Sequence, residues 1–382
     1  MNVTDPDFKP PVSWKGNLAI DYTLPWGGLI LTAEVEGSWV KQAAFVNSIN
    51  IKMATAANAA AATAAGTTPV LPDGRIQYNG TITPNITGTP YTTSVGSSAL
   101  LNNPNFSTVY VLTNTNKGQA SDYTIELRRP MKNHWAFSAA YTRSHATEVN
   151  PFTSSVAQSN FSGRAYFNPN ENVAARTNYM TPDKFVLSAT REFDFFHNLR
   201  ALTAVTFVFR AQTGHPYSWT FKGDANGDGF SNNDLFYVPN GPNDPKVTWN
   251  STTEEAAFFD FVSHSSLKNY LGQVVPRNSE LSPYQETLDL HFEQNIPIPG
   301  HARLQIFCDC LNFANLLNSR WGVTTGVDFP YNRTVAGATF NRLGNNGHGQ
   351  YVYHFNSNTL GGVPVFTDLA RWQLQIGAKL SF

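Results

Sequence analysis

The last eleven residues of the chain alternate without a break between apolar and polar or small side chains. In an extended strand successive side chains point to opposite faces. One face would carry Trp372, Leu374, Ile376, Ala378, Leu380 and Phe382. On a soluble protein, such a strand would invite aggregation through its unpaired edge and its apolar face. A transmembrane β-barrel requires this pattern, because lipid covers one face and water or a polar filling covers the other.

The composition favours strands and turns over helical bundles. Charged residues make up 14% of the chain and aromatic residues 13%, with 27 glycines and 23 prolines. The sequence has no run of about 18 apolar residues, so we expect no transmembrane helix. The net charge of −1 gives no reason to expect nucleic acid as a partner.

Alternating segments recur along the chain, mostly in pairs. We predict strands at 12–24 with 29–45, 119–129 with 134–146, 184–193 with 199–213, 285–296 with 301–313, and a last one at 370–382. A tight hairpin turn, Pro25-Trp26-Gly27-Gly28, separates the first pair. The other connections are long, at roughly 46–118, 147–183, 214–284 and 314–369.

Short and long connections alternate, and outer-membrane barrels place short turns in the periplasm and long loops outside the cell. We therefore predict an all-β fold, an antiparallel transmembrane barrel in the bacterial outer membrane. Single-chain bacterial barrels normally have an even number of strands. Because roughly nine strands are found here, and Met1–Asp7 does not read as a secretory signal, we expect nine or ten strands of a larger, truncated barrel.

Two loop segments have features of their own. The Ala-rich stretch 53–65 is a short helix or disordered, and we attach no chemistry to it. Thr252-Thr253-Glu254-Glu255 is typical of a helix start, and Phe258, Phe261, Val262 and Leu267 follow at roughly helical spacing. We expect a helix packed over the barrel mouth, with a substrate-gripping helix as the alternative.

The segment Asp224–Asp234 matches the start of an EF-hand-type calcium loop. Oxygen-bearing side chains alternate at Asp224, Asn226 and Asp228, and Gly229 suits the sharp turn. Leu235 stands where a bidentate Glu belongs, with Asn232 and Asp234 as further oxygen donors. The alternatives are a structural calcium site and a rigid Asx-rich turn without metal.

Several residues are assigned by their place on the predicted strands. Trp26, Trp135 and Trp372 suit an interfacial girdle, or else the core of a soluble sandwich. We interpret Cys308 and Cys310 as small apolar side chains facing lipid. The lumen-facing set is Asp289, His291, Glu293, Arg303, Gln305 and Asp309. Since no lipase elbow, phosphate loop or zinc-binding helix pattern occurs, we expect no catalysis.

From about residue 108 onward the chain resembles the carboxyl-terminal barrel of a TonB-dependent outer-membrane receptor. The resemblance is closest to the Oar-like group, which carries a carboxypeptidase-regulatory-like domain ahead of its plug. It rests on the run from Gly214-His215-Pro216-Tyr217-Ser218 to Asn233-Asp234-Leu235, on Arg277-Asn278-Ser279 before Leu288-Asp289-Leu290, on the strand 304–317 with Asp309, Asn312 and Asn315, and on the terminal strand.

This resemblance implies a barrel of about 22 strands. It implies energised uptake of a scarce solute, in which extracellular loops and a plug bind the solute and TonB displaces the plug. The implied partners are outer-membrane lipid, the TonB complex through the plug, and the barrel assembly machinery. That machinery would read the last strand through Trp372, Leu374, Ile376, Leu380 and Phe382. No plug, TonB box or signal peptide is found in this sequence, so we expect the chain alone neither to close nor to couple to energy.

Two other interpretations remain open. One is a passive porin of about ten or twelve strands, which an even strand count and planar-bilayer conductance would favour. The other is a soluble or surface-attached β-sandwich adhesin, which would partition into water without detergent. The sequence does not identify the transported solute.

Overall fold

A computed structural model describes residues 1–51, 70–78, 103, 105–106, 108–300, 302–341 and 349–382. The Ala-rich stretch 53–65 lies outside the described residues. Nine long strands form an antiparallel sheet in which each pairs with the next: β2 (Val12–Thr23), β3 (Ile30–Ser48), β5 (Gln119–Lys132), β6 (Trp135–Glu148), β8 (Asp183–Phe193), β9 (Thr203–Gln212), β15 (Gln285–Pro297), β16 (Arg303–Leu311) and β19 (Gln373–Ser381).

These nine strands are the nine predicted from alternation, with ends that differ by a few residues. The largest difference concerns β9, which begins at Thr203 and not at residue 199, and β16 ends at Leu311, two residues before the predicted end. The strand we expected over 304–317 was wrong in its second half. There Asn312 adopts a left-handed conformation (φ 51°), and the short helix α4 (Phe313–Leu317) follows. A residue in this region of φ/ψ space ends the extended ladder.

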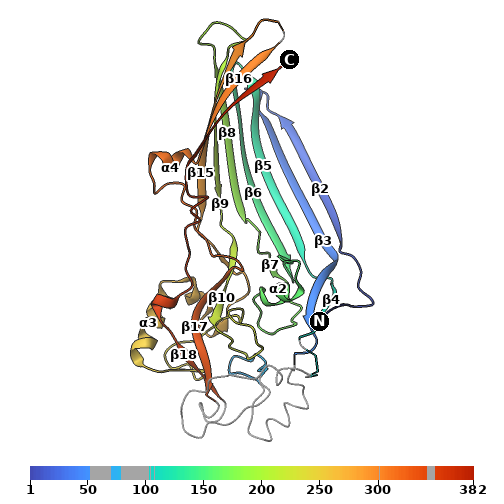
Figure 1. Ribbon diagram of the computed structural model, residues 1–382, viewed down its shortest axis with the longest axis vertical. Helices are drawn as coiled ribbons and strands as arrows, with labels where there is room; N and C mark the ends of the chain where they lie inside the picture. The colour runs from blue at the N-terminus through green and yellow to red at the C-terminus, as the bar shows by residue number, and fades with distance from the viewer. Residues whose placement is uncertain (52–69, 79–102, 104, 107, 301, 342–348) are drawn as a thin grey trace.

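The short turns lie at one end of the sheet. Gly27 and Gly28 both have φ +68°, a backbone that side-chain-bearing residues rarely adopt. At the next hairpin Asn133 and His134 form a two-residue turn, with φ values of 54° and 62°. The carboxyl terminus lies at this same end (Figure 1).

Among the described residues the sheet is not closed. β2 pairs with β3, β19 pairs with β16, and β2 and β19 do not pair with each other. Three short strands extend it at the loop side: β1 (Asn2–Thr4), β4 (Tyr110–Thr115) and β7 (Ala175–Arg176). The all-β architecture is confirmed, and a closed barrel is not observed in the part of the chain that the structure covers.

At the opposite end the long connections are folded. A five-stranded sheet consists of β10 (Pro216–Lys222), β12 (Val247–Trp249), β14 (Glu280–Leu281), β17 (Asn332–Asn341) and β18 (Gln350–His354), and β11 (Tyr237–Val238) pairs with β13 (Gln273–Val274). The helical elements of these loops are α2 (Ala157–Ser162), α3 (Thr252–Ser263), η2 (Ser266–Tyr270) and η4 (Ser357–Thr359). We call residues 214–284 and 324–363 together the loop domain. It lies beyond the sheet end that is remote from the carboxyl terminus (Figure 1).

The helix predicted at Thr252 is confirmed. Its N-cap is Ser251, whose side chain accepts a hydrogen bond from the Glu254 amide. Phe258 and Val262 are buried in the core of the loop domain, while Leu267 belongs to η2. None of the helices in the described part of the chain is long and apolar enough to span a bilayer.

Candidate functional site

One face of the nine-stranded sheet is apolar from strand to strand. Residues paired across neighbouring strands share a face, and one such row is Phe137, Ala189, Phe207, Leu290, Cys310 and Leu374. Large side chains on this face stay exposed: Leu18 is 67% exposed and Ile376 71%. We call this face the apolar belt. An exposed apolar surface of this extent is suited to lipid and not to water.

The opposite face is polar, and its side chains bond across the strands. Thr124 and Thr142 lie 2.9 Å apart through their hydroxyl oxygens, and Thr190 and Thr206 lie 2.8 Å apart. The Ser138 hydroxyl donates to Glu126 over 2.6 Å. Such contacts give the polar groups partners on a surface whose other side is apolar. The sheet therefore separates two environments.

The six residues predicted to line a lumen all lie on this polar face. Asp289, His291 and Glu293 occupy alternate positions of β15, and Arg303, Gln305 and Asp309 alternate positions of β16. The structure brings three of them together. His291 Nδ1 lies 2.5 Å from the Asp309 carboxylate, and His291 Nε2 lies 3.5 Å from Glu293. Asp289 instead accepts a hydrogen bond from the Asn312 amide at the end of β16.

The terminal strand β19 forms an edge of the sheet. Its described backbone partner is β16, so its other edge is open to strand addition. Leu374, Ile376 and Leu380 lie on the apolar belt, Trp372 directly precedes the strand, and Phe382 is 96% exposed. Recognition of this strand by an assembly machinery stays a prediction.

Aromatic residues are exposed at both ends of the apolar belt. Trp26 and Trp135 lie at the short-turn end and Trp372 at the loop end. The Arg191 guanidinium lies 4.8 Å from the centre of the Trp135 ring. Cys308 and Cys310 are free thiols on the same face, half-buried and buried respectively by their neighbours.

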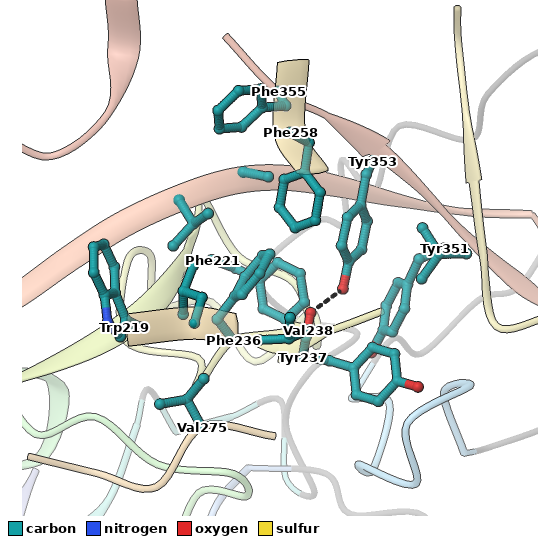
Figure 2. Packing of buried hydrophobic residues seen from close by; sticks show 14 of the residues in the cluster. Trp219, Phe221, Phe236, Tyr237, Val238, Phe258, Val275, Tyr351, Tyr353 and Phe355 are labelled. Atoms are coloured by element: carbon teal, nitrogen blue, oxygen red, sulfur yellow. Dashed lines mark hydrogen bonds between the residues drawn. The ribbon is translucent and has the colours of Figure 1, made fainter. Parts of the chain in front are cut away.

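The main buried core of the described chain is in the loop domain. Phe221, Phe236 and Phe258 are fully buried, and the Phe221 and Phe236 ring centres lie 4.8 Å apart. The Tyr353 hydroxyl donates to the Tyr237 carbonyl over 2.8 Å, as Figure 2 shows. Because these rings come from β10, the residue before β11, α3 and β18, the two long loops that contain them are joined into one body.

Arg277 and Asn278 tie this loop domain to the end of the large sheet. The buried Arg277 guanidinium donates to the carbonyls of Glu148 and Val149, each over 2.6 Å. Asn278 donates to the carbonyl of Arg176 over 2.7 Å. Burial and the neighbouring Arg164 lower the pKa of Arg277 to about 10. The Arg277-Asn278-Ser279 motif therefore has a structural role that its sequence alone did not reveal.

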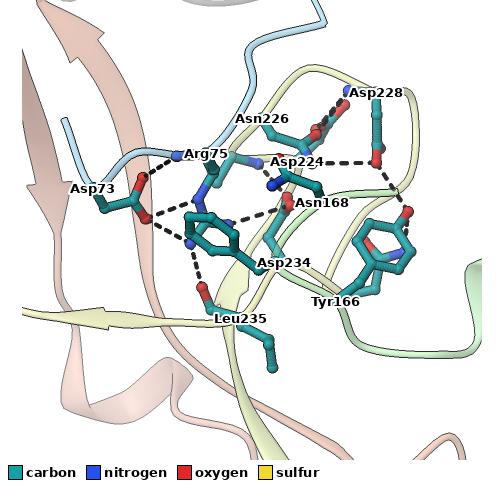
Figure 3. Close-up of polar contacts among 12 residues, drawn as sticks. Asp73, Arg75, Tyr166, Asn168, Asp224, Asn226, Asp228, Asp234 and Leu235 are labelled. Atoms are coloured by element: carbon teal, nitrogen blue, oxygen red, sulfur yellow. Dashed lines mark hydrogen bonds and ion pairs between the residues drawn. The ribbon is translucent and has the colours of Figure 1, made fainter. Parts of the chain in front are cut away.

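The segment 224–234 is a compact turn in which carboxylates accept backbone hydrogen bonds (Figure 3). Asp224 accepts from the amides of Gly227 and Gly229, over 2.7 and 2.8 Å. Asn226 accepts from the Asp228 amide over 2.9 Å, and Asp228 accepts from the Phe230 amide over 2.8 Å and from the Tyr166 hydroxyl over 2.9 Å. These bonds are the Asx-turn pattern that a metal-free turn would use.

The remaining predicted ligands also have protein partners. Asn232 accepts from the Gly223 amide over 2.8 Å, and Asp234 accepts from the Ala225 amide over 2.8 Å. In the described residues, no group of three or more His, Cys, Asp or Glu side chains is placed to hold a metal ion. Both the calcium site and the metal-free turn therefore stay open.

Arg75, which the sequence did not single out, is the cation of this cluster. Its fully buried guanidinium lies 2.7 Å from Asp73 and 3.4 Å from Asp234, and it bonds to the Leu235 carbonyl. Burial raises the pKa of Asp234 to about 7, against the opposing effect of Arg75. Burial also raises the pKa of Asp228, reinforced by Asp234 and Asp224. The carboxylates thus outnumber the cations here.

Comparison with known proteins agrees with the two-faced sheet. No curated protein matches the chain. Residues 1–348 match the family described as outer membrane beta barrel domain. Since the match covers most of the chain, and the sheet carries an exposed apolar belt opposite a polar face, the protein is a bacterial outer-membrane protein that belongs to the outer membrane beta barrel domain family.

Proposed function

We propose that this chain forms barrel wall and extracellular loops of a TonB-dependent receptor of the Oar-like type, which takes up a scarce solute with energy from the inner membrane. The observation that carries the proposal is the loop domain. Tyr217, Trp219 and Phe221 of its core come from Gly214–Leu235, a segment that resembles that group, and Arg277 of the similar Arg277–Ser279 fastens the loop domain to the large sheet. A simple hydrophilic pore has less need of a large, rigid structure over its outer end.

The open sheet supports a wide barrel. Within the described residues the nine long strands leave β2 and β19 unpaired with each other, as expected for part of a barrel with more strands. Barrels of about eight strands fill their interior with side chains, whereas barrels of about 22 strands hold a plug. The polar face, with its His291–Asp309 pair, would then line a lumen and contact that plug.

Uptake would follow the family's sequence of events. The loop domain and the plug would bind the solute outside the cell, and TonB would displace the plug. The solute itself is not part of the proposal, and no reaction is assigned to the chain. Calcium would be structural if the turn at 224–234 binds it, stiffening the loop domain.

A conductance measurement tests the proposal. Protein purified from outer membranes should show no steady ion conductance in planar bilayers, because a plug fills the lumen, and should bind the periplasmic domain of TonB from the same cells. A steady open channel without TonB binding would instead establish the passive porin. Partition into the aqueous phase without detergent would point to the adhesin.

A further inference from the structure

At the short-turn end, the apolar belt finishes in two arginines among aromatic rings. Trp135 of β6 pairs with Arg191 of β8, and Phe137, two residues further along β6, pairs with Arg129 of β5. All four residues share the face of the sheet that carries the belt. Because outer-membrane barrels place their short turns in the periplasm, this end of the belt meets the head groups of the periplasmic leaflet.

Both arginines contact Trp135. The Arg191 guanidinium carbon lies 4.8 Å from the centre of the Trp135 ring and 5.6 Å from the centre of the Phe193 ring. Arg129 donates from Nη1 to the Trp135 carbonyl over 3.1 Å. Two strand spacings and two residues along the sheet place the Cα atoms of Arg129 and Arg191 about 12 Å apart, with Trp135 on the strand between them. Since both side chains extend toward Trp135, one lipid head group can contact both. We call Arg129, Trp135, Arg191 and Phe193 the basic margin.

The two guanidinium groups keep donors for an anion. Each has five N–H groups. Arg129 uses two of them on the carbonyls of Trp135 and Gly27, and Arg191 uses one on the Asn133 carbonyl, over 3.2 Å. Stacking on Trp135 occupies the flat face of Arg191 and leaves its N–H groups directed outward in the guanidinium plane.

No carboxylate in the described part of the chain forms an ion pair with either arginine. Glu192, the residue after Arg191, points to the polar face, where it lies 3.1 Å from His134 Nδ1. The basic margin therefore carries two positive charges that the described carboxylates do not pair with.

Aromatic rings continue from the basic margin past the end of β8. Phe193 stacks on Phe195, with ring centres 5.2 Å apart and ring planes 5° apart. Phe195 is 66% exposed and Trp135 48%. Aromatic rings favour the boundary between acyl chains and head groups. Apolar contacts for acyl chains thus adjoin donors for a phosphate.

We infer that the basic margin binds an anionic phospholipid of the periplasmic leaflet. The lipid phosphate accepts hydrogen bonds from Arg129 and Arg191, and the acyl chains lie along Trp135 and Phe193. Guanidinium groups suit phosphate oxygens, and basic residues at a membrane surface attract lipids with net negative charge. No described carboxylate is placed here to pair with the ammonium of a zwitterionic lipid. The inference rests on the outer-membrane assignment and is independent of energised uptake.

Native mass spectrometry of protein purified from outer membranes tests the inference. The detergent-solubilised protein is titrated with phosphatidylglycerol, or with phosphatidylcholine that has the same acyl chains, and the fraction of protein with a bound lipid is measured. We expect phosphatidylglycerol to bind about tenfold more tightly, which corresponds to about 1.4 kcal/mol. Equal affinity for the two lipids would overturn the inference. This comparison uses the wild-type protein, so it does not depend on the folding of a variant.

Arg128 provides a matched control for the position of the site. It is exposed, directly precedes Arg129 on β5 and faces the polar side, where it pairs with Ser138. Arg129→Gln and Arg191→Gln should each weaken phosphatidylglycerol binding about fivefold, which corresponds to about 1 kcal/mol. Arg128→Gln should leave it unchanged. An equal loss in Arg128→Gln would show that net charge, and not the basic margin, holds the lipid.

A soluble phosphate separates a lipid site from a site for free anions. Glycerol 3-phosphate carries the phosphate without acyl chains and is titrated in the same way. We expect it to bind much more weakly than phosphatidylglycerol, because it lacks the contacts with the aromatic rings. Binding as tight as that of the lipid would mean that the two arginines hold a free phosphate, and would overturn the inference.

Discussion

The large sheet exposes large apolar side chains, whereas the loop domain buries them. In the sheet, Ile376 is 71% exposed, whereas in the loop domain Phe221 and Phe236 are fully buried. The solvent differs, because lipid surrounds the apolar belt and water surrounds the loops. A membrane strand therefore needs no second layer of protein, while a loop region in water must build its own core.

The largest effect should come from emptying that core. Phe236→Ala removes a ring that contacts Phe221 and Tyr353, and should lower the free energy of unfolding of the loop domain by about 3–5 kcal/mol. Limited proteolysis of intact cells would report the loosened loops. Phe292→Ala, on the apolar belt and 44% exposed, is the control, because lipid fills the space that it leaves. Equal protease sensitivity in both variants would erase the contrast between the two regions.

The next effect tests the two faces of one strand. Ile376→Lys places a charge on the apolar belt and should cost about 2–4 kcal/mol, since a charge facing the bilayer centre is poorly solvated. Gln375→Lys, one residue earlier, faces the polar side and should change stability little. Unfolding of the protein in lipid vesicles by urea measures both. Were Gln375→Lys the more harmful of the two, the assignment of faces would be reversed.

A third prediction concerns the joint between the regions. Arg277→Met keeps the apolar stem but removes the Arg277 donor from the Glu148 carbonyl and leaves the Val149 carbonyl only the longer bond from Arg164, at a cost of roughly 2–3 kcal/mol. The loop domain should become protease-sensitive near residue 277 while the sheet stays folded. Arg320→Met, at an exposed residue that follows α4, is the matched control. Unfolding of the sheet in parallel would mean that the two regions form a single cooperative unit.

The last effect depends on pH. The pKa of Asp234 is raised from its ordinary 3.8 to about 7 in the folded protein, so the folded state binds this proton more tightly than the unfolded state. The stabilisation that comes from the raised pKa of Asp234 is therefore fully present below about pH 4, and it is lost as the pH rises through about 7. Thermal unfolding of the loop domain at pH 5 and pH 8 should show the decrease.

Asp228→Asn sharpens this result. The substitution removes one of the buried carboxylates but keeps an acceptor for the Tyr166 hydroxyl. It should reduce the difference in unfolding free energy between pH 5 and pH 8 by about 1 kcal/mol or less. If calcium binds the turn, chelation should destabilise wild type at pH 8 and leave the variant unaffected. If the chelator leaves the thermal stability of the wild-type protein unchanged, the turn is metal-free.

Local patterns predicted a large part of this fold. Alternation identified each long strand, because a strand between lipid and a polar interior shows its environment at every second residue. The start of α3 could also be predicted, since capping is a local interaction between Ser251 and Glu254. The strand end at Asn312 was not, because no regular pattern signals a single left-handed residue.

The sequence by itself determined which face of each long strand meets lipid, and thereby the compartment. The tertiary structure alone decided that the long loops form a packed domain, that Arg277 fastens it to the sheet, and that Arg75 lies between Asp73 and Asp234. The physical reason is the range of the interactions. Two-sided solvation acts on neighbouring residues, whereas β10 pairs with β17, and Tyr353 packs on Phe221, across more than a hundred residues of chain.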